Sequence, residues 1–430
     1  MAEEERNDLS LLNSDLEDYA DDFVSLIRSR SMRATQELIT ASSLIQGLER
    51  YYENTPVVLL MYFYLEAEES LRVWGLTAKG IQFVHSQEID IQQLEKLEKE
   101  LKKSLELDKK TVDRAPRKRA LVFSMEQSTV ESREQEVIIQ ELSDLLFPME
   151  VGSRLKQNGT EHLIILPALN IQQIPLAILT PFEDQSHLIE SFSYSFVPSL
   201  SLIKNLRPRT KQTELSSLDQ QTLAEASLVV GNPEFPAHSI WKLPPLPGAE
   251  EEVKLLSNSL QLDAENLLIG SAATKSQILA KASRISTLLY FATHGVADPQ
   301  NALDGSGLFF AGDESDQEGF WTSRDIQHSR LSASLVILSA CQTGLGMPQD
   351  AGVIGLFRAF TKAGVKNVIM SLWSVDDQAT QELMQIFMEE IQKPQKYFPA
   401  GHLRKAMLTY KEQRPDPIFW AAFANFGNPY

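Results

Sequence analysis

A lone cysteine and a histidine occupy comparable places in this sequence, each directly after a run of apolar residues. Cys341, the only cysteine among 430 residues, follows the strand-like run 335–340. His294 follows a second such run, 287–293, and precedes Gly295. A side chain placed directly after a buried strand lies at the carboxyl edge of a sheet, where open α/β proteins form their sites. If the two strands are neighbours, this edge brings a thiol and a base together.

The chemistry of such a pair is nucleophilic cleavage of a peptide or ester bond. A thiol attacks well only as its thiolate, and an imidazole with a pKa near about 6.5 can take the thiol proton and return it to a leaving amine. The backbone amides of Gly295 and Cys341 are candidates to stabilise the developing oxyanion. The cysteine comes 47 residues after the histidine, close to the spacing of about 50 in the caspase pattern.

Each of the two residues also has an ordinary structural interpretation. A free cysteine is often a small buried hydrophobe, and a histidine at a strand end is often only a hydrogen-bonded structural residue. Their joint occurrence at strand ends of one α/β region favours the interpretation of His294 and Cys341 as a catalytic dyad.

Composition indicates a globular protein of two or three domains, with 43% hydrophobic residues to form buried cores. The acidic start of the chain lacks the features of a secretory signal, and the longest apolar stretch, 57–65, is about half of the ~20 residues that a membrane-spanning helix needs. A single cysteine excludes an intramolecular disulfide and fits a reducing compartment. We therefore expect a cytoplasmic protein with no membrane partner.

Charge and missing motifs exclude several other classes of function. A formal charge of −18 argues against nucleic acid as a partner. The chain has no Gly-x-Ser-x-Gly element of serine hydrolases, no phosphate-binding loop and no His-Glu-x-x-His motif. With one cysteine and widely spaced histidines there is no recognisable metal site. The sequence therefore predicts neither a cofactor nor a metal ion.

Hydrophobic periodicity divides the chain into three predicted segments: a helical region 1–55, a second segment 56–220 and a third segment 221–430. The second segment opens with a strand meander, and a polar stretch at 207–221 ends it. The third alternates strands and helices, which predicts a parallel sheet with crossover helices. A basic cluster between 109 and 119 is either a solvated loop or a self-processing site. The predicted strands are 57–65, 71–76, 81–84, 162–167, 228–230, 267–269, 287–293, 308–310, 335–338 and 365–372, and the predicted helices include 14–52, 94–105, 131–147, 353–362 and 378–391.

Four ordered motifs resemble the CHAT family of caspase-like cysteine peptidases. They are THG (293–295), LSACQTG (338–344), GLFRAFTKAG (355–364) and SLWSVDD (371–377), and the segments 175–179, 194–199 and 246–252 resemble less diagnostic parts of the family. The resemblance extends from about residue 56 to the C-terminus. It implies a caspase-like α/β fold related to separases and gingipains, a mostly parallel sheet flanked by helices. It also implies that 56–220 is a degenerate caspase-like subdomain and 221–430 the active peptidase domain, with a short helical N-terminus in front.

The resemblance also suggests a pocket for the residue before the scissile bond. In the related separases an aspartate shortly after the Leu-Trp strand end lines this pocket, and Asp376 and Asp377 follow Trp373 in the same way. Carboxylates there would favour a substrate arginine or lysine. Asp377 could instead cap the helix that begins near 378. Ser339 is a further candidate contact, although metacaspases that prefer basic residues tend to carry aspartate at that position.

Partners and regulation follow from the same resemblance. Many CHAT proteins carry tetratricopeptide repeats ahead of the peptidase, and the ~54 residues here are too few for the three units that such a stack requires. We therefore expect a protein or peptide substrate, together with either a separate activator protein or restraint by the N-terminal helices. The alternative function is a catalytically inactive pseudo-peptidase that serves as a protein-interaction scaffold, in which Cys341 is chemically ordinary.

Overall fold

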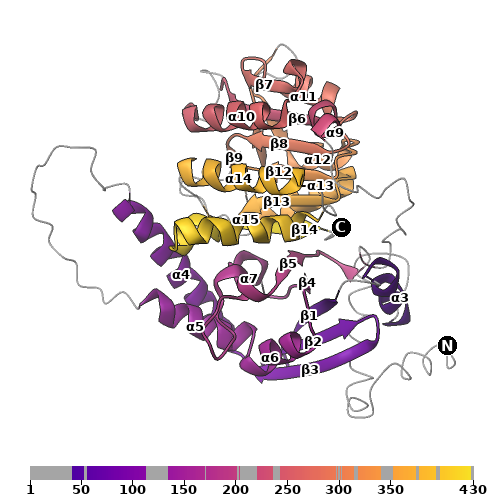
Figure 1. The fold of residues 1–430 in the computed structure, drawn as a ribbon, viewed down its shortest axis with the longest axis vertical. Helices are drawn as coiled ribbons and strands as arrows, with labels where there is room; N and C mark the ends of the chain where they lie inside the picture. The colour runs from indigo at the N-terminus through magenta and orange to yellow at the C-terminus, as the bar shows by residue number, and fades with distance from the viewer. Residues whose placement is uncertain are drawn as a thin grey trace, which may run out of the picture.

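The computed structural model of the chain describes residues 41–52, 56–112, 134–169, 171–200, 203, 220–235, 243–296, 298, 301, 303–313, 318–339, 352–373, 377–393 and 398–427. Within this part, eleven strands form one sheet flanked by helices (Figure 1). The strands are β1 (Val57–Leu65), β2 (Ser70–Thr77), β3 (Gly80–Glu88), β4 (His162–Leu166), β5 (Ser193–Phe196), β6 (Ser227–Pro233), β7 (Leu267–Gly270), β8 (Leu288–Ala292), β12 (Leu335–Leu338), β13 (Asn367–Ser371) and β14 (Phe423–Gly427).

The order of these strands is β3-β2-β1-β4-β5-β14-β13-β12-β8-β6-β7. The pairs β1–β2, β2–β3 and β13–β14 are antiparallel, and the other pairs of this sheet are parallel. The predicted α/β class with a mostly parallel sheet is therefore confirmed, and so is the strand meander that follows Pro56.

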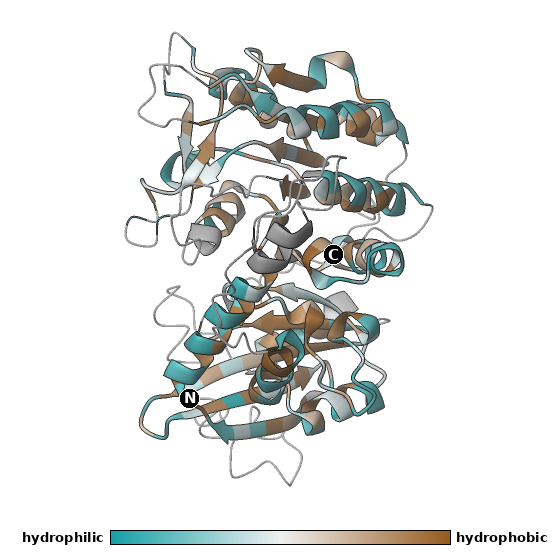
Figure 2. Cartoon of the chain, turned by 90° about the vertical axis from the view of Figure 1, so that its left-hand side faces the viewer, coloured by the Kyte–Doolittle hydropathy of each residue, from teal (hydrophilic) through white to brown (hydrophobic). Residues whose placement is uncertain are grey.

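Helices cover both faces of the strands in the C-terminal half, and Figure 2 shows the apolar strands lying between two helical layers. The helices of the molecule are α3 (Ala41–Tyr52), α4 (Ile91–Val112), α5 (Gln135–Leu146), α6 (Met149–Gln157), α7 (Leu188–Ser191), α9 (Gln220–Glu225), α10 (Pro247–Leu260), α11 (Lys275–Ala282), α12 (Ser323–His328), α13 (Gly352–Ala363), α14 (Asp377–Gln392), α15 (Pro399–Gln413) and α16 (Pro417–Trp420), with short 3-10 turns at Ile171–Gln173, Leu176–Ile178 and Ala264–Asn266. Residues 14–40 of the predicted helical stretch 14–52 lie outside the described residues, as do most of the basic cluster and its loop.

Strand β1 carries apolar side chains on both of its faces, and both faces must therefore be buried. Its residues alternate between two hydrophobic clusters, because successive side chains of a strand point to opposite faces. Leu59 and Met61 pack in the cluster that contains Leu48 of α3. Leu60 and Tyr62 pack in the larger cluster with α4 and α5. The described end of the N-terminal helical segment is therefore docked on the sheet.

Two features of the sheet differ from the sequence-based prediction. The predicted strand 308–310 belongs to a separate antiparallel sheet, in which β10 (Gly307–Phe309) lies between β9 (Gly295–Val296) and β11 (Phe320–Thr322). Strand β10 pairs antiparallel with both strands that are its neighbours in sequence, β9 and β11, and therefore takes no place in the parallel sheet. Strands β5 and β14 of the large sheet were not predicted.

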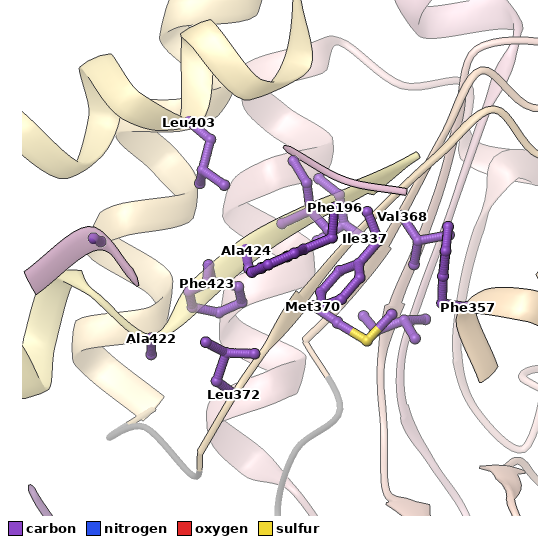
Figure 3. Close-up of a cluster of buried hydrophobic side chains, with 14 of the residues drawn as sticks. Phe196, Ile337, Phe357, Val368, Met370, Leu372, Leu403, Ala422, Phe423 and Ala424 are labelled. Atoms are coloured by element: carbon purple, nitrogen blue, oxygen red, sulfur yellow. The ribbon is translucent and has the colours of Figure 1, made fainter. Parts of the chain in front are cut away.

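Strand β14 joins the two halves of the molecule. It pairs antiparallel with β13 and parallel with β5, where Phe426 is opposite Phe196. The rings of these two residues have their centroids 5.3 Å apart. Figure 3 shows Phe196, Phe423 and Met370 gathered in the apolar cluster at this junction. One sheet therefore runs through both of the predicted segments 56–220 and 221–430.

Among the described helices, none combines the length and apolar character that crossing a bilayer would require. The described residues also contain no group of three or more His, Cys, Asp or Glu side chains arranged to hold a metal ion.

Candidate active site

Strands β8 and β12 are direct neighbours in the sheet and run parallel. Their register pairs Phe291 with Leu338, and the next residue, Ser339, donates its amide hydrogen to the Phe291 carbonyl over 3.0 Å. His294 and Cys341 each come three residues after this pair in the sequence. The predicted adjacency of the two strands is therefore confirmed. Cys341 itself lies outside the described residues.

The backbone around His294 is fixed by the small second sheet. The Thr293 hydroxyl donates a hydrogen bond to the Phe309 carbonyl, and the Phe309 amide donates to the His294 carbonyl over 2.9 Å. The histidine side chain is 4% exposed. His294 therefore stands where the chain leaves the large sheet and enters strand β9.

Gly295 begins strand β9 and lies opposite Leu308. The hydrogen bond from Phe309 to His294 flanks this pair, so the Gly295–Leu308 pair is of the non-hydrogen-bonded type. The Gly295 amide is consequently directed away from β10. This orientation is compatible with the predicted role of the amide as an oxyanion donor.

The imidazole of His294 has a partner that the sequence did not reveal. Its Nε2 atom lies 2.9 Å from the carbonyl oxygen of Pro244. A carbonyl oxygen can only accept, so Nε2 carries the hydrogen in the neutral ring and Nδ1 carries the lone pair. The ring of Phe235 packs beside the imidazole, with a centroid distance of 5.1 Å. Nδ1 is therefore the nitrogen equipped to accept a proton.

Pro244 was missed because it contributes a backbone carbonyl, which no side-chain pattern signals. Prolines at 244 and 245 do mark the segment before α10 as a restricted, non-helical stretch, and Pro247 is the first residue of the helix. The sequence thus indicated a rigid segment before the helix, but it did not indicate that this segment contacts His294.

Ser339 belongs to a chain of buried hydrogen bonds beneath the strand ends. Its hydroxyl bonds to the phenol of Tyr290, and that phenol donates to the carboxylate of Glu252 on α10. Burial, followed by the charge of Glu252, raises the pKa of Tyr290 well above its usual value. The phenol therefore stays protonated and links β8, β12 and α10.

Trp373 follows β13 at the same edge of the sheet and is 7% exposed. In the part of the chain that the structure describes, no acceptor lies within hydrogen-bonding distance of its indole Nε1. A buried indole N–H normally has a partner. Asp376 lies outside the described residues, and of Asp377 only the backbone, at the start of α14, is described.

The sheet order and the flanking helices define the class of this protein, the caspase-like α/β fold. A chain of the Saccharomyces cerevisiae separase–securin complex has a similar structure, with a TM-score of 0.52 at 11% identity over 97% of this chain and 33% of that chain. The model of the CHAT domain matches residues 136–428, and the chain belongs to the CHAT family.

Two curated relatives contain a stretch similar to part of this chain within much longer proteins. Tetratricopeptide repeat protein 28 of Mus musculus is 27% identical over 331 residues, and its Homo sapiens counterpart is 28% identical over 329 residues. Each match covers 67% of this chain and 13% of the relative. The chain thus matches only a small part of the length of these relatives.

Proposed function

We propose that this protein is a cysteine endopeptidase in which Cys341 is the nucleophile and His294 the general base. The observation that carries the proposal is the register of β8 and β12. It pairs Phe291 with Leu338, so the histidine and the cysteine each follow a paired position by the same three residues. Membership of the CHAT family, with its caspase-like fold, supports the same function.

The proposed reaction starts with transfer of the thiol proton of Cys341 to Nδ1 of His294. The thiolate attacks the carbonyl carbon of the scissile peptide bond, and the carbonyl oxygen becomes an oxyanion. The imidazolium returns its proton to the amine as the C–N bond breaks, which leaves a thioester. Water then attacks the thioester, gives one proton to the same histidine and releases the acid and the thiol. Throughout, the Nε2–H bond to Pro244 keeps Nδ1 as the proton-accepting atom.

Substrate contacts are proposed at the same edge of the sheet. The amides of Gly295 and Cys341 stabilise the oxyanion, and the indole N–H of Trp373 donates to a substrate carbonyl. Asp376 and Asp377 form an acidic pocket for an arginine or lysine, with Ser339 near its base. A protein or peptide is the substrate, in the cytoplasm, and an activator protein or the N-terminal region regulates access.

A peptidyl electrophile that labels thiols tests the dyad. We expect it to label the wild-type chain, and Cys341→Ala to abolish labelling. His294→Ala should slow labelling by roughly 10²- to 10⁴-fold, because the thiol loses its base. His328→Ala is the matched control, since that exposed ring also bonds a backbone carbonyl, that of Arg324 at 2.7 Å, but lies on α12. A rate that does not depend on His294 would favour the pseudo-peptidase scaffold.

The acidic pocket needs a separate test with a peptide library. We expect new termini to follow arginine or lysine, and the charge-removing variants Asp376→Asn and Asp377→Asn to weaken that preference. Cys341→Ala identifies background cleavage. Enrichment of small or apolar residues before the cut would reject the pocket and leave the peptidase assignment intact.

A further inference from the structure

Asn232, near the end of β6, connects this strand to the segment that carries Pro244. Its side-chain oxygen accepts a hydrogen bond from the Leu246 amide over 2.8 Å. Its side-chain nitrogen donates to the carboxylate of Glu250, in the first turn of α10, also over 2.8 Å. One amide group therefore holds both the last residue before the helix and the helix itself.

The backbone of Asn232 is shaped for this contact. Its φ is 42°, in the left-handed region that asparagine tolerates better than most residues. Glu250 remains a good acceptor, because its hydrogen bonds to Lys254 and to Asn232 lower its pKa. The backbone conformation of Asn232 and its hydrogen bond to Glu250 together fix the direction of the Asn232 side chain.

Residues close in sequence to Asn232 and to Leu246 make two contacts with the imidazole of His294. Leu246 is two residues after Pro244, whose carbonyl accepts from Nε2 over 2.9 Å. Phe235 is three residues after Asn232, and its ring lies 5.1 Å from the imidazole ring. Pro245, the residue between Pro244 and Leu246, has a fixed φ, so a displacement at Leu246 is passed on to the Pro244 carbonyl.

We propose that Asn232 is a positioning residue that selects the Nε2–H tautomer of His294 by holding the Pro244 carbonyl in place. The inference rests on the proposed function, for which it supplies the reason that Nδ1 is the base. Without the Asn232 side chain, the carbonyl moves away and the neutral ring exchanges between both tautomers. Only one of these has a lone pair on Nδ1.

The direct test reads the tautomer and needs no peptidase activity. Side-chain ¹⁵N shifts of histidine are measured above pH 8 in the full chain with Cys341→Ala, and His294→Ala assigns the signal. We expect a single Nε2–H tautomer with Asn232 and an averaged signal in Asn232→Gly, since glycine removes the amide without straining the positive φ.

The matched control is Asn266→Gly. Asn266 Nδ2 also ties two segments together, donating to the Glu225 carbonyl over 3.2 Å, but Glu225 precedes the amino end of β6. This variant should leave the His294 tautomer unchanged. A shift of equal size in Asn266→Gly would show general loosening and overturn the assignment.

A kinetic measurement connects the tautomer to function. In the chain with Cys341, Asn232→Gly should lower the maximal rate of labelling by about tenfold while the half-saturating concentration of the electrophile stays constant, because orientation of the base is lost and binding is not. A wild-type chain that is never labelled would defeat the proposed function, even with the tautomer shift present. An unchanged tautomer in Asn232→Gly would defeat the role of Asn232, even in an active peptidase.

Discussion

Two buried histidines in this molecule show how position determines the role of one residue type. His162 is the first residue of β4, and its two ring nitrogens lie 2.9 and 3.0 Å from the hydroxyls of Ser193 and Ser195. His294 comes two residues after the last residue of β8, and its ring bonds a backbone carbonyl. His162 thus lies inside the sheet as a structural residue, whereas His294 lies at the edge where parallel strands place their sites.

His162 should make the folded state sensitive to acid. Burial lowers its pKa from about 6.5 to about 3. Between these values the unfolded chain binds a proton that the folded chain does not, so the free energy of unfolding falls as the pH falls, by up to about 1.4 kcal/mol per pH unit. In His162→Gln this contribution is absent. Urea unfolding at pH 7, 6 and 5 should show a smaller loss of stability in the variant, and parallel losses would contradict the prediction.

Tyr290→Phe should weaken the support beneath the strand ends. The variant loses the phenol that accepts from Ser339 and donates to Glu252, so we expect a loss of about 1–3 kcal/mol in the free energy of unfolding. Ser339 comes two residues before Cys341, so labelling should also slow by about tenfold. Tyr194→Phe removes another buried phenol, on β5, and should leave labelling unchanged. Equal labelling rates in Tyr290→Phe and wild type would refute the link.

At the scale of elements, the sequence predicted best those strands that are buried on both faces. Strands β8 and β12 are short continuous apolar runs, and such runs are typical of central strands in a parallel sheet. Strand β14 was missed because Ala424, Asn425 and Gly427 are poor strand formers, and only its two neighbours give it a strand conformation. Strand β10 has a typical strand sequence, but its sheet is decided by the local pairs that it forms.

The sequence also indicated only part of the candidate site. His294 and Gly295 could be proposed from the sequence because a titratable side chain followed by glycine after an apolar run is a pattern of residue types. Pro244 and Asn232 were not found, because their roles depend on a carbonyl and an amide whose partners are 50 and 14 residues away. Contacts over such separations become visible only when the sheet places β6 beside β8.

Gly231→Ala should separate helix α10 from strand β6. A Cβ at this position would lie 2.5 Å from Cγ2 of Val253 and 3.0 Å from the carbonyl oxygen of Ala249. We expect a loss of about 1–3 kcal/mol in the free energy of unfolding from overpacking. Val253→Ala provides space, so the double variant should be less destabilised than the two single losses combined. Strict additivity in this double-mutant cycle would contradict a direct clash.

At the scale of the whole molecule, the two halves are joined through a continuous sheet and through α15. The polar stretch 207–221 predicted a boundary, because composition reports on the local chain alone. It could not show that β14, the last strand, returns to lie between β13 and β5. Helix α15 then packs against α7 of the N-terminal half, as Figure 1 shows. Lys411 of this helix forms an ion pair with Glu190 of α7.

Arg404 provides the clearest test of this junction. From α15 its guanidinium donates to the carbonyls of Ile189 and Glu190 in α7, over 2.7 and 2.5 Å, and burial lowers its pKa. Because the group is partly exposed to solvent, we expect Arg404→Ala to cost about 1–2 kcal/mol. Arg324→Ala removes only an exposed pair with Asp304 and should destabilise the fold less than Arg404→Ala does.

Hydrogen exchange locates the effect of Arg404→Ala. A continuous sheet predicts one cooperative unfolding transition for the wild-type chain, because neither half can unfold without exposing an edge of β5 or β14. Loss of the Arg404 contacts should speed exchange in α7, β5 and β14 and leave β6 and β8 protected, since those strands lie beyond β13 and β12. Uniformly faster exchange in all strands would show that α15 supports the fold as a whole. Two separate transitions in the wild-type chain would show that the halves fold independently and that β14 only bridges them.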